Sequence, residues 1–328
     1  MNKQIQQIIA KKEKLDSFQP LPKALVDNLH NYLEIELTYS SNALEGNTLT
    51  RAETALVVEK GITVNGKTLR EHLEAVNHAE TFNWISQFAD KKINSINESL
   101  ILKLHRHILS KIDNENAGKY RDIAVRIAGS RVIMPNPAKV PTLMADFIAW
   151  LPKATLHPVE LAIEAHLRFV SIHPFVDGNG RTGRLLMNLI LMQAGYPPAI
   201  IRAEDRRVYI NAIEKAQLSR DTKKYTAFML DSIDRSLDVY LDAIDPKNSH
   251  TTTIEPQKLL KIGQLATSTG ETVPTIRYWT QLGLLDVADQ TKGGYQLYST
   301  DMIRKATKIR KLQREKRLTL EEIKKLLQ

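Results

Sequence analysis

The sequence contains no cysteine among its 328 residues. That absence excludes disulfides, thiolate catalysis and zinc sites with cysteine ligands, and it suits a reducing compartment. Glycine and proline are scarce, at 14 and 13 residues, so long disordered tracts are not expected. There is no run of about 18 apolar residues that could span a membrane, and the N-terminus lacks the apolar core of a signal peptide. We therefore expect a cytoplasmic protein with no membrane association.

Positive charge is concentrated near the C-terminus. The formal net charge is +9, and from Glu255 onward there are 14 lysines and arginines against 8 acidic residues. A basic module of that size is compatible with nucleic-acid contact. Charge alone favours the plainer interpretation, which is a solvated helical surface.

Apolar residues recur at three- and four-residue spacing along most of the chain, which predicts a mainly α-helical fold. The stretch 123–133 differs, because it is rich in β-branched residues and carries Gly129-Ser130 at its centre. That pattern predicts a hairpin. A polar stretch between Pro246 and Pro256 has the composition of a linker. The predicted helices are 25–37, 68–88, 98–112, 141–150, 159–172 and 184–194.

The most informative block is residues 173–184, HPFVDGNGRTGR, which joins two apolar helical segments. His173 can accept a proton near neutral pH, and Asp177 offers a hard oxygen ligand for Mg²⁺. The glycines around Asn179 allow backbone N–H groups to point inward at the start of the next helix. Arg181 and Arg184 are one helical turn apart. This set matches transfer of a phosphate-containing group, where positioning and charge neutralisation dominate.

Other interpretations of the block are weaker. Its glycines formally match the dinucleotide fingerprint GxGxxG, but that fingerprint must follow a strand within a βαβ unit, and the preceding segment is helical. The chain contains neither a GxxxxGK[ST] loop nor an HExxH zinc motif. A structural helix corner with a capping aspartate would account for a lone His-Pro pair, but not for all twelve positions.

The block resembles the signature of the Fic family, HPFx[D/E]GN[G/K]RxxR, at every defined position. The resemblance implies a helical core in a bacterial protein adenylyltransferase, in which a histidine deprotonates a target hydroxyl and the hydroxyl attacks the α-phosphate of ATP. By position, His173 would be the base and Asp177 the Mg²⁺ ligand, while Phe175 would fix the loop. The same resemblance assigns nucleotide and phosphate binding to Gly178, Asn179, Gly180, Arg181 and Arg184.

Two further segments are similar to parts of that family. The predicted hairpin 126–135 occupies the place of the family's flap, which would hold an extended target segment as an added strand. Residues 207–212 resemble the segment that lines the adenine pocket, where Tyr209 would stack and Asn211 would form hydrogen bonds. For each of these two residues a structural role is equally well supported.

Near the N-terminus, residues 41–47 read SNALEGN and resemble the family's inhibitory motif, [S/T]xxxE[G/N]. The resemblance gives Ser41 and Glu45 an inhibitory role. A carboxylate that reached Arg184 would form a charge-assisted pair with a guanidinium that the γ-phosphate needs. Gly46 is also suited to ending a helix, and the two roles are compatible. In some relatives the same glutamate supports removal of AMP, and that alternative stays open.

The C-terminal residues 259–298 show helix-turn-helix spacing, with Gly270 at the turn and a second helix at 272–280. They resemble the MerR-type winged helix, with the wing at 292–295. Arg277 and Lys292 are candidate contacts to DNA phosphates. Gln296 stands where an arginine is common in that family, so docking of a protein is the alternative.

These observations predict a mainly α-helical Fic core with a β-hairpin flap and a small C-terminal winged helix-turn-helix. The predicted parts are an N-terminal helical region with the inhibitory motif (1–95), the catalytic core (96–243), a linker (244–257) and the winged helix (258–328). We expect transfer of AMP from ATP, with Mg²⁺, to a Tyr, Ser or Thr of a target protein. The alternative is a DNA-binding regulator whose core senses nucleotide or modifies itself. DNA and a second copy of the chain are the other candidate partners.

Overall fold

The computed structural model describes residues 3–244, 259–290, 295–299, 301–316 and 318–327. Residues 245–257 of the predicted linker, and Lys292 in the predicted wing, lie outside the described residues. The chain forms two compact units, Met1–Ser249 and His250–Gln328, and each is treated by itself below. Among the described residues, no helix combines the length and the apolar content that a membrane crossing requires.

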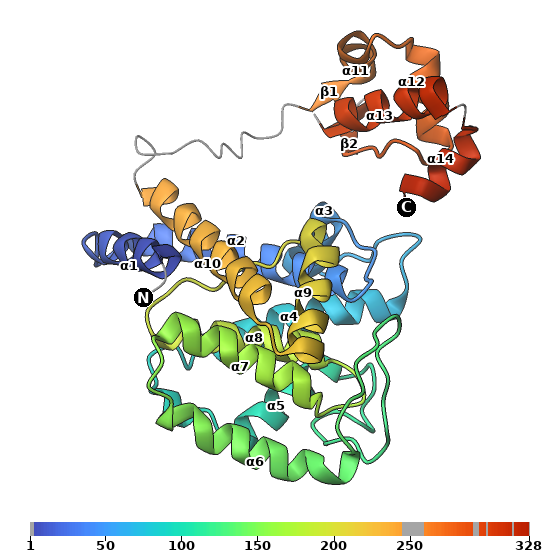
Figure 1. The fold of residues 1–328 in the computed structure, drawn as a ribbon. Coiled ribbons are helices and arrows are strands. Elements are labelled where there is room, and N and C mark those ends of the chain that lie inside the picture. Colours follow the sequence, from blue (N-terminus) through green and yellow to red (C-terminus); the bar gives the residue numbers. More distant parts are fainter. Residues whose placement is uncertain (1–2, 245–258, 291–294, 300, 317, 328) are drawn as a thin grey trace. The chain divides into compact units, whose positions relative to one another are not determined.

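The first unit is built from helices joined by short turns (Figure 1), as the apolar spacing predicts. One helix is markedly longer than its apolar pattern, because it continues through Ser40, Ser41 and Asn42, which are polar but buried. The helices are α1 (Lys3–Asp16), α2 (Lys23–Leu44), α3 (Arg51–Lys60), α4 (Leu69–Ser86), α5 (Glu98–Leu109), α6 (Val140–Trp150), α7 (Pro158–Ile172), α8 (Asn179–Gln193), α9 (Arg206–Ser219) and α10 (Lys223–Ile244).

The central element of this unit is α8, whose residues are almost all buried. A helix that is enclosed on every side is typical of the middle of a helical core. It packs closely on α7, and a Cβ added at Gly183 would lie 3.1 Å from Val170 and 3.2 Å from Phe169. The loop 173–178 that joins α7 to α8 is thereby held by two buried helices.

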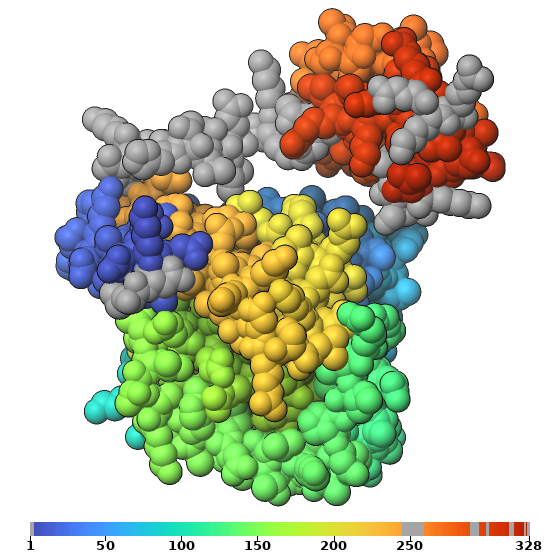
Figure 2. Space-filling view, in the orientation of Figure 1, coloured from blue at the N-terminus to red at the C-terminus, as the bar shows by residue number. Residues whose placement is uncertain are grey.

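The N-terminal helices belong to the same compact unit as the predicted catalytic core, so no unit ends near residue 95. Figure 2 shows α1 lying against α10 on the surface, where Lys11 contacts Asp234 and Asp238 at 2.8 and 2.7 Å. Helix α2 packs on α4, and α4 packs on α8. These contacts place the C-terminal end of α2 beside the start of α8.

The predicted flap hairpin turns where the sequence indicated, but it is not a β-hairpin. Ser130 N–H donates to the Ile127 carbonyl over 3.1 Å, with Gly129 at φ 77°. No strand is assigned to the described residues between α5 and α6. Instead, Arg131 N–H donates to Glu214 on α9 over 2.9 Å. This backbone donor therefore has a partner outside the hairpin in place of a ladder bond.

The C-terminal unit contains a helix-turn-helix and a small antiparallel sheet in the order β1-β3-β2. Gly270, at φ 68°, ends the first helix, and the Thr272 hydroxyl caps the second by accepting from Thr275 N–H. Buried residues such as Ile276 and Trp279 form a core of their own. The elements are β1 (Leu260–Lys261), α11 (Ile262–Thr269), α12 (Val273–Gln281), β2 (Asp289–Gln290), β3 (Gln296–Tyr298), α13 (Asp301–Lys316) and α14 (Leu320–Leu327).

Candidate active site

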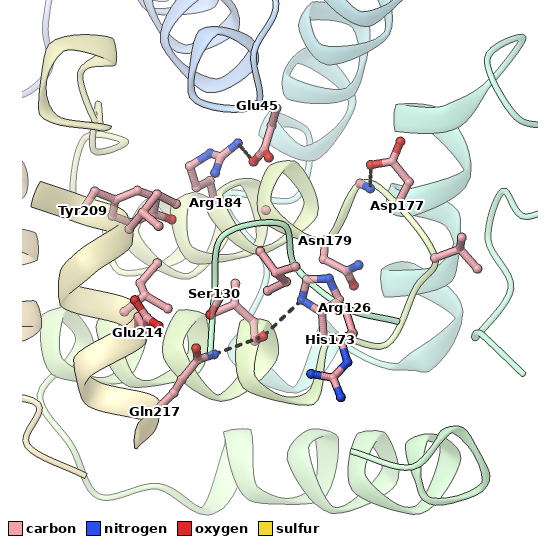
Figure 3. Close-up of a pocket in the computed structure, with 17 residues that line it drawn as sticks. Glu45, Arg126, Ser130, His173, Asp177, Asn179, Arg184, Tyr209, Glu214 and Gln217 are labelled. Carbon is pink, nitrogen blue, oxygen red and sulfur yellow. Dashed lines mark hydrogen bonds and ion pairs between the residues drawn. The ribbon is translucent and has the colours of Figure 1, made fainter. Parts of the chain in front are cut away.

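A cavity of about 260 Å³ opens beside the loop that joins α7 to α8. Its walls come from this loop, the turn of the flap and one face of α9 (Figure 3). It therefore gathers segments that are far apart in the sequence. The lining residues are Glu45, Arg126, Ile127, Ser130, Val170, His173, Val176, Asp177, Gly178, Asn179, Gly180, Arg184, Tyr209, Ile210, Ile213, Glu214 and Gln217.

His173 ends α7 in a left-handed conformation, φ 51° and ψ 61°. Its N–H donates to Phe169 O over 3.0 Å, and its carbonyl accepts from Arg121 Nε over 2.8 Å, so the backbone is fixed from both sides. Burial lowers the pKa of the imidazole, although the Val170 carbonyl near Nδ1 opposes this effect. A ring that is neutral at pH 7 and carries its proton on Nδ1 leaves Nε2 to accept a proton.

The loop keeps its shape through a buried cluster around Phe175. This ring is fully buried and stacks on His105, with a centroid distance of 3.6 Å. The Asn179 side chain accepts from Phe175 N–H over 2.9 Å and donates to Phe175 O over 2.8 Å. Since both ends of that amide bond the Phe175 backbone, the Asn179 side chain holds the loop closed.

The start of α8 offers backbone N–H donors at the cavity, as anion sites at helix N-termini do. Gly178 precedes the helix at φ 75°. At Gly180 an added Cβ would lie 2.1 Å from Glu45 Oε1. Glycine is therefore required at position 180 for a carboxylate oxygen to approach the helix start so closely.

The two residues of the predicted inhibitory motif both contact Arg184. Arg184 Nη2 donates to Glu45 Oε1 over 2.7 Å (Figure 3), and Arg184 Nε donates to Ser41 Oγ over 2.9 Å. Arg184 Nη2 also reaches the Ser41 carbonyl at 2.9 Å. Burial is the largest influence and lowers the pKa of this guanidinium, but Glu45 and Tyr209 together outweigh it and the net shift is upward. Arg184 is thus a buried cation whose hydrogen bonds are taken up by α2.

Asp177 and Arg181 lie at a second hollow of about 500 Å³ beside the cavity. The Arg181 side chain is 2% exposed, lies 3.3 Å from Glu74 Oε1 and 3.6 Å from Asp177 Oδ1, and does not line the main cavity. Asp177 is 44% exposed and lines both spaces. One accessible carboxylate next to a phosphate site fits Mg²⁺, which usually takes one or two carboxylates together with phosphate and water oxygens.

The far end of the cavity is lined by α9. Tyr209, Ile213 and Gln217 recur every four residues and share one face of the helix, and all three line the cavity. Asn211 lies on the exposed face of α9 and does not line it. The sequence prediction therefore selected Asn211 where the structure brings Gln217, whose amide donates to Ser171 Oγ over 3.2 Å. The four-residue spacing from Tyr209 was the signal that could have found it.

Tyr209 lies with its ring buried, and this burial raises the pKa of the phenol. Its hydroxyl is hydrogen-bonded to His166 Nε2 at 2.9 Å. It therefore supports the wall of the cavity from inside the core.

Comparison with known proteins identifies both units. A model of the Fic/DOC family matches residues 95–191, and a model of MerR HTH family regulatory proteins matches residues 260–328. Protein adenylyltransferase Fic of Drosophila melanogaster is 38% identical over 236 residues, which are 71% of this chain and 46% of that protein. The chain thus spans about half the length of the curated relatives it matches.

Solved structures agree. A Fic domain containing signaling protein from Bacteroides thetaiotaomicron is 31% identical with a TM-score of 0.67, over 73% of this chain and 96% of that one. Fic-1 from C. elegans is 29% identical with a TM-score of 0.67, over 75% of this chain and 74% of that one. With these similarities added to the motif and the fold, the chain belongs to the Fic/DOC family and carries a MerR-type helix-turn-helix at its C-terminus.

Proposed function

We propose that the first unit transfers AMP from ATP to a hydroxyl group of a target protein. The observation that carries this proposal is the placement of the partly buried His173 beside a glycine-lined helix start, with Arg184 and Asp177 lining the same cavity. The name of the Drosophila relatives, protein adenylyltransferase, supports the same activity. Each group in this set has one task in phosphoryl-group chemistry.

In the proposed reaction, His173 Nε2 accepts the proton of the target hydroxyl as the hydroxyl oxygen bonds to the α-phosphorus of ATP. The bond from that phosphorus to the bridging oxygen breaks, and pyrophosphate leaves. Backbone N–H groups at Gly178–Gly180 stabilise the charge on the α-phosphate, and Arg184 binds the terminal phosphates. Mg²⁺ on Asp177 would neutralise the leaving pyrophosphate. The apolar face formed by Ile210 and Ile213 would hold the base.

Target recognition is assigned to the flap. The described residues between α5 and α6 form no strand, so backbone groups of the flap other than Arg131 N–H, which is bonded to Glu214, can pair with an extended target segment. Ser130 and Arg126 at the turn line the cavity. A target strand paired there would present its side chain close to His173.

We also assign Glu45 a restraining role. Its carboxylate occupies the approach to Gly180 and binds Arg184. ATP must displace it before the triphosphate can reach both groups. Removal of the carboxylate should therefore activate the transfer.

The test compares three proteins: the natural chain, Glu45→Gly, and Glu45→Gly with His173→Ala. Each is incubated with Mg²⁺, a lysate of the source cells, and ATP labelled at either the α or the γ position. We expect label on protein only from α-labelled ATP, strongest with Glu45→Gly and absent without His173. Label only from the γ position would indicate a kinase, and no label from either would remove the proposal.

A second candidate function, DNA binding by the C-terminal unit, is favoured by the exposure of Arg277 and Tyr278 on α12, the second helix of the helix-turn-helix. That helix is the one that enters the major groove in such motifs. If Arg277 contacts a phosphate, Arg277→Ala should weaken binding of the full chain to DNA and reduce the slope of log K against log salt by about 1. If the full chain shows no salt-dependent binding to DNA, a protein partner is favoured instead.

A further inference from the structure

Arg70, near the start of α4, holds the carboxylate that is proposed to bind Mg²⁺. Its Nη2 lies 2.6 Å from Asp177 Oδ2, and its Nε lies 3.2 Å from Glu74 Oε1. The other oxygen of Asp177 accepts from Gly178 N–H over 2.5 Å. Both carboxylate oxygens therefore have partners, and a metal ion at Oδ2 would compete with the Arg70 guanidinium for that oxygen.

The position of Arg70 is fixed by the start of its helix. Thr68 caps α4 in a capping box with Glu71, and the side chains of Thr48 and Thr68 help to hold the pKa of Glu71 at about 2. Thr48 N–H and hydroxyl both donate to Glu71 Oε1, over 2.9 and 2.6 Å. Arg70 thus lies in the first turn of α4, and this turn is hydrogen-bonded to Thr48, shortly after Glu45.

Glu74, one turn further along α4, connects the two sets of charges. It accepts from Asn47 Nδ2 over 3.0 Å and lies 3.3 Å from Arg181 Nη1. Arg181 is almost fully buried, and its Nε and Nη1 have no hydrogen-bond partner. Near Asp177 there are therefore two cations, and only Arg70, with a side chain 57% exposed, has solvent to move into.

We propose that Arg70 is a positioning residue that competes with the divalent cation for Asp177, so that metal binding requires the Arg70–Asp177 pair to open. This inference rests on the proposed function, because it takes Asp177 as the metal ligand. It adds a second restraint, on the metal side of the site, to that of Glu45 on the phosphate side. Residues 45–48, directly after α2, supply Glu45 to one restraint and, through Asn47 and Thr48, bind the start of α4 that carries the other.

The test measures how much a metal ion strengthens nucleotide binding. Affinity for a non-hydrolysable ATP analogue is measured by calorimetry in the Glu45→Gly background, once with Mn²⁺ and once with a chelator. The dissociation constant with chelator divided by that with Mn²⁺ isolates the metal contribution. Any general attraction between Arg70 and the phosphates affects both measurements and cancels in this ratio. For an exposed ion pair, we expect Arg70→Gln to raise this ratio by about two- to fivefold.

Arg51→Gln is the matched control, because Arg51 is 55% exposed and pairs with Glu36, away from Asp177. It should leave the ratio unchanged. Asp177→Asn should bring the ratio close to one, with or without Arg70. An unchanged or lower ratio in Arg70→Gln, while Asp177→Asn still abolishes the metal effect, would overturn this inference alone. A ratio that is insensitive to Asp177→Asn would overturn the proposed metal site itself.

Discussion

The contact between Glu45 and Arg184 gives a prediction with a magnitude. A hydrogen bond to a charged group contributes about 1.5–3 kcal/mol, but the Glu45 side chain is 40% exposed, so we expect about 1–2 kcal/mol here after solvent screening. Since 1.4 kcal/mol is a factor of ten, Glu45→Gln should tighten ATP binding about 5- to 30-fold. Glu45→Gly should tighten it further, because the oxygen that lies over Gly180 is also removed.

The assay is calorimetric titration with the non-hydrolysable analogue and Mg²⁺. The fold should survive both substitutions, because Ser41 still accepts two hydrogen bonds from Arg184. Glu34→Gln is the control, since it removes one negative charge from the same helix at a residue that binds Asn83 instead. Equal affinity in the parent protein, Glu45→Gln and Glu45→Gly would refute the reasoning, and an effect of glycine alone would show that bulk and not charge obstructs ATP.

Three other predictions follow from the site. Burial lowers the pKa of His173, so the rate of AMP transfer by Glu45→Gly should increase with pH and reach its plateau at a pH below about 6.5, the ordinary histidine value. A plateau that is reached only above pH 7.5 contradicts this. Burial lowers the pKa of His105 to about 4, so the unfolded chain alone binds this proton between about pH 6.5 and 4, and stability falls as the pH falls. His105 should contribute about 2 kcal/mol of the loss at pH 5, so the loss measured by urea unfolding should be smaller by about that amount in His105→Gln; the buried His78 and His166 account for a further part. Asn179→Ala leaves two buried backbone groups of Phe175 without partners and should lower the unfolding free energy by about 2–4 kcal/mol; a change below 1 kcal/mol in urea unfolding would mean that water replaces the amide.

The position of α2 has a consequence for regulation. Glu45 and Arg184 are 139 residues apart in sequence, yet they belong to one compact unit. Any partner that displaces the end of α2 would release Arg184 without changing the catalytic loop. The restraint is therefore separable from the chemistry.

Local sequence was sufficient for much of this protein. The three- and four-residue apolar spacing predicted six of the helices of the first unit, α2 and α4 to α8, since that spacing is the period of a helix with a buried face. The block from His173 to Arg184 indicated phosphate-group chemistry, because its residue types lie within one loop and one helical turn. Gly270 and Thr272 similarly marked the turn of the helix-turn-helix through their backbone and capping preferences.

Tertiary structure decided what depends on packing between distant segments. It turned Gln217 toward the cavity and Asn211 toward solvent, because only the packing of α9 determines which of its faces is covered. In the folded chain the Asn179 amide bonds the backbone of Phe175, and Asp177 forms an ion pair with Arg70 on another helix. Tertiary structure also left the flap without strands and bonded Arg131 N–H to Glu214 on α9. A sequence states which groups are present, but their partners are set by the folded chain.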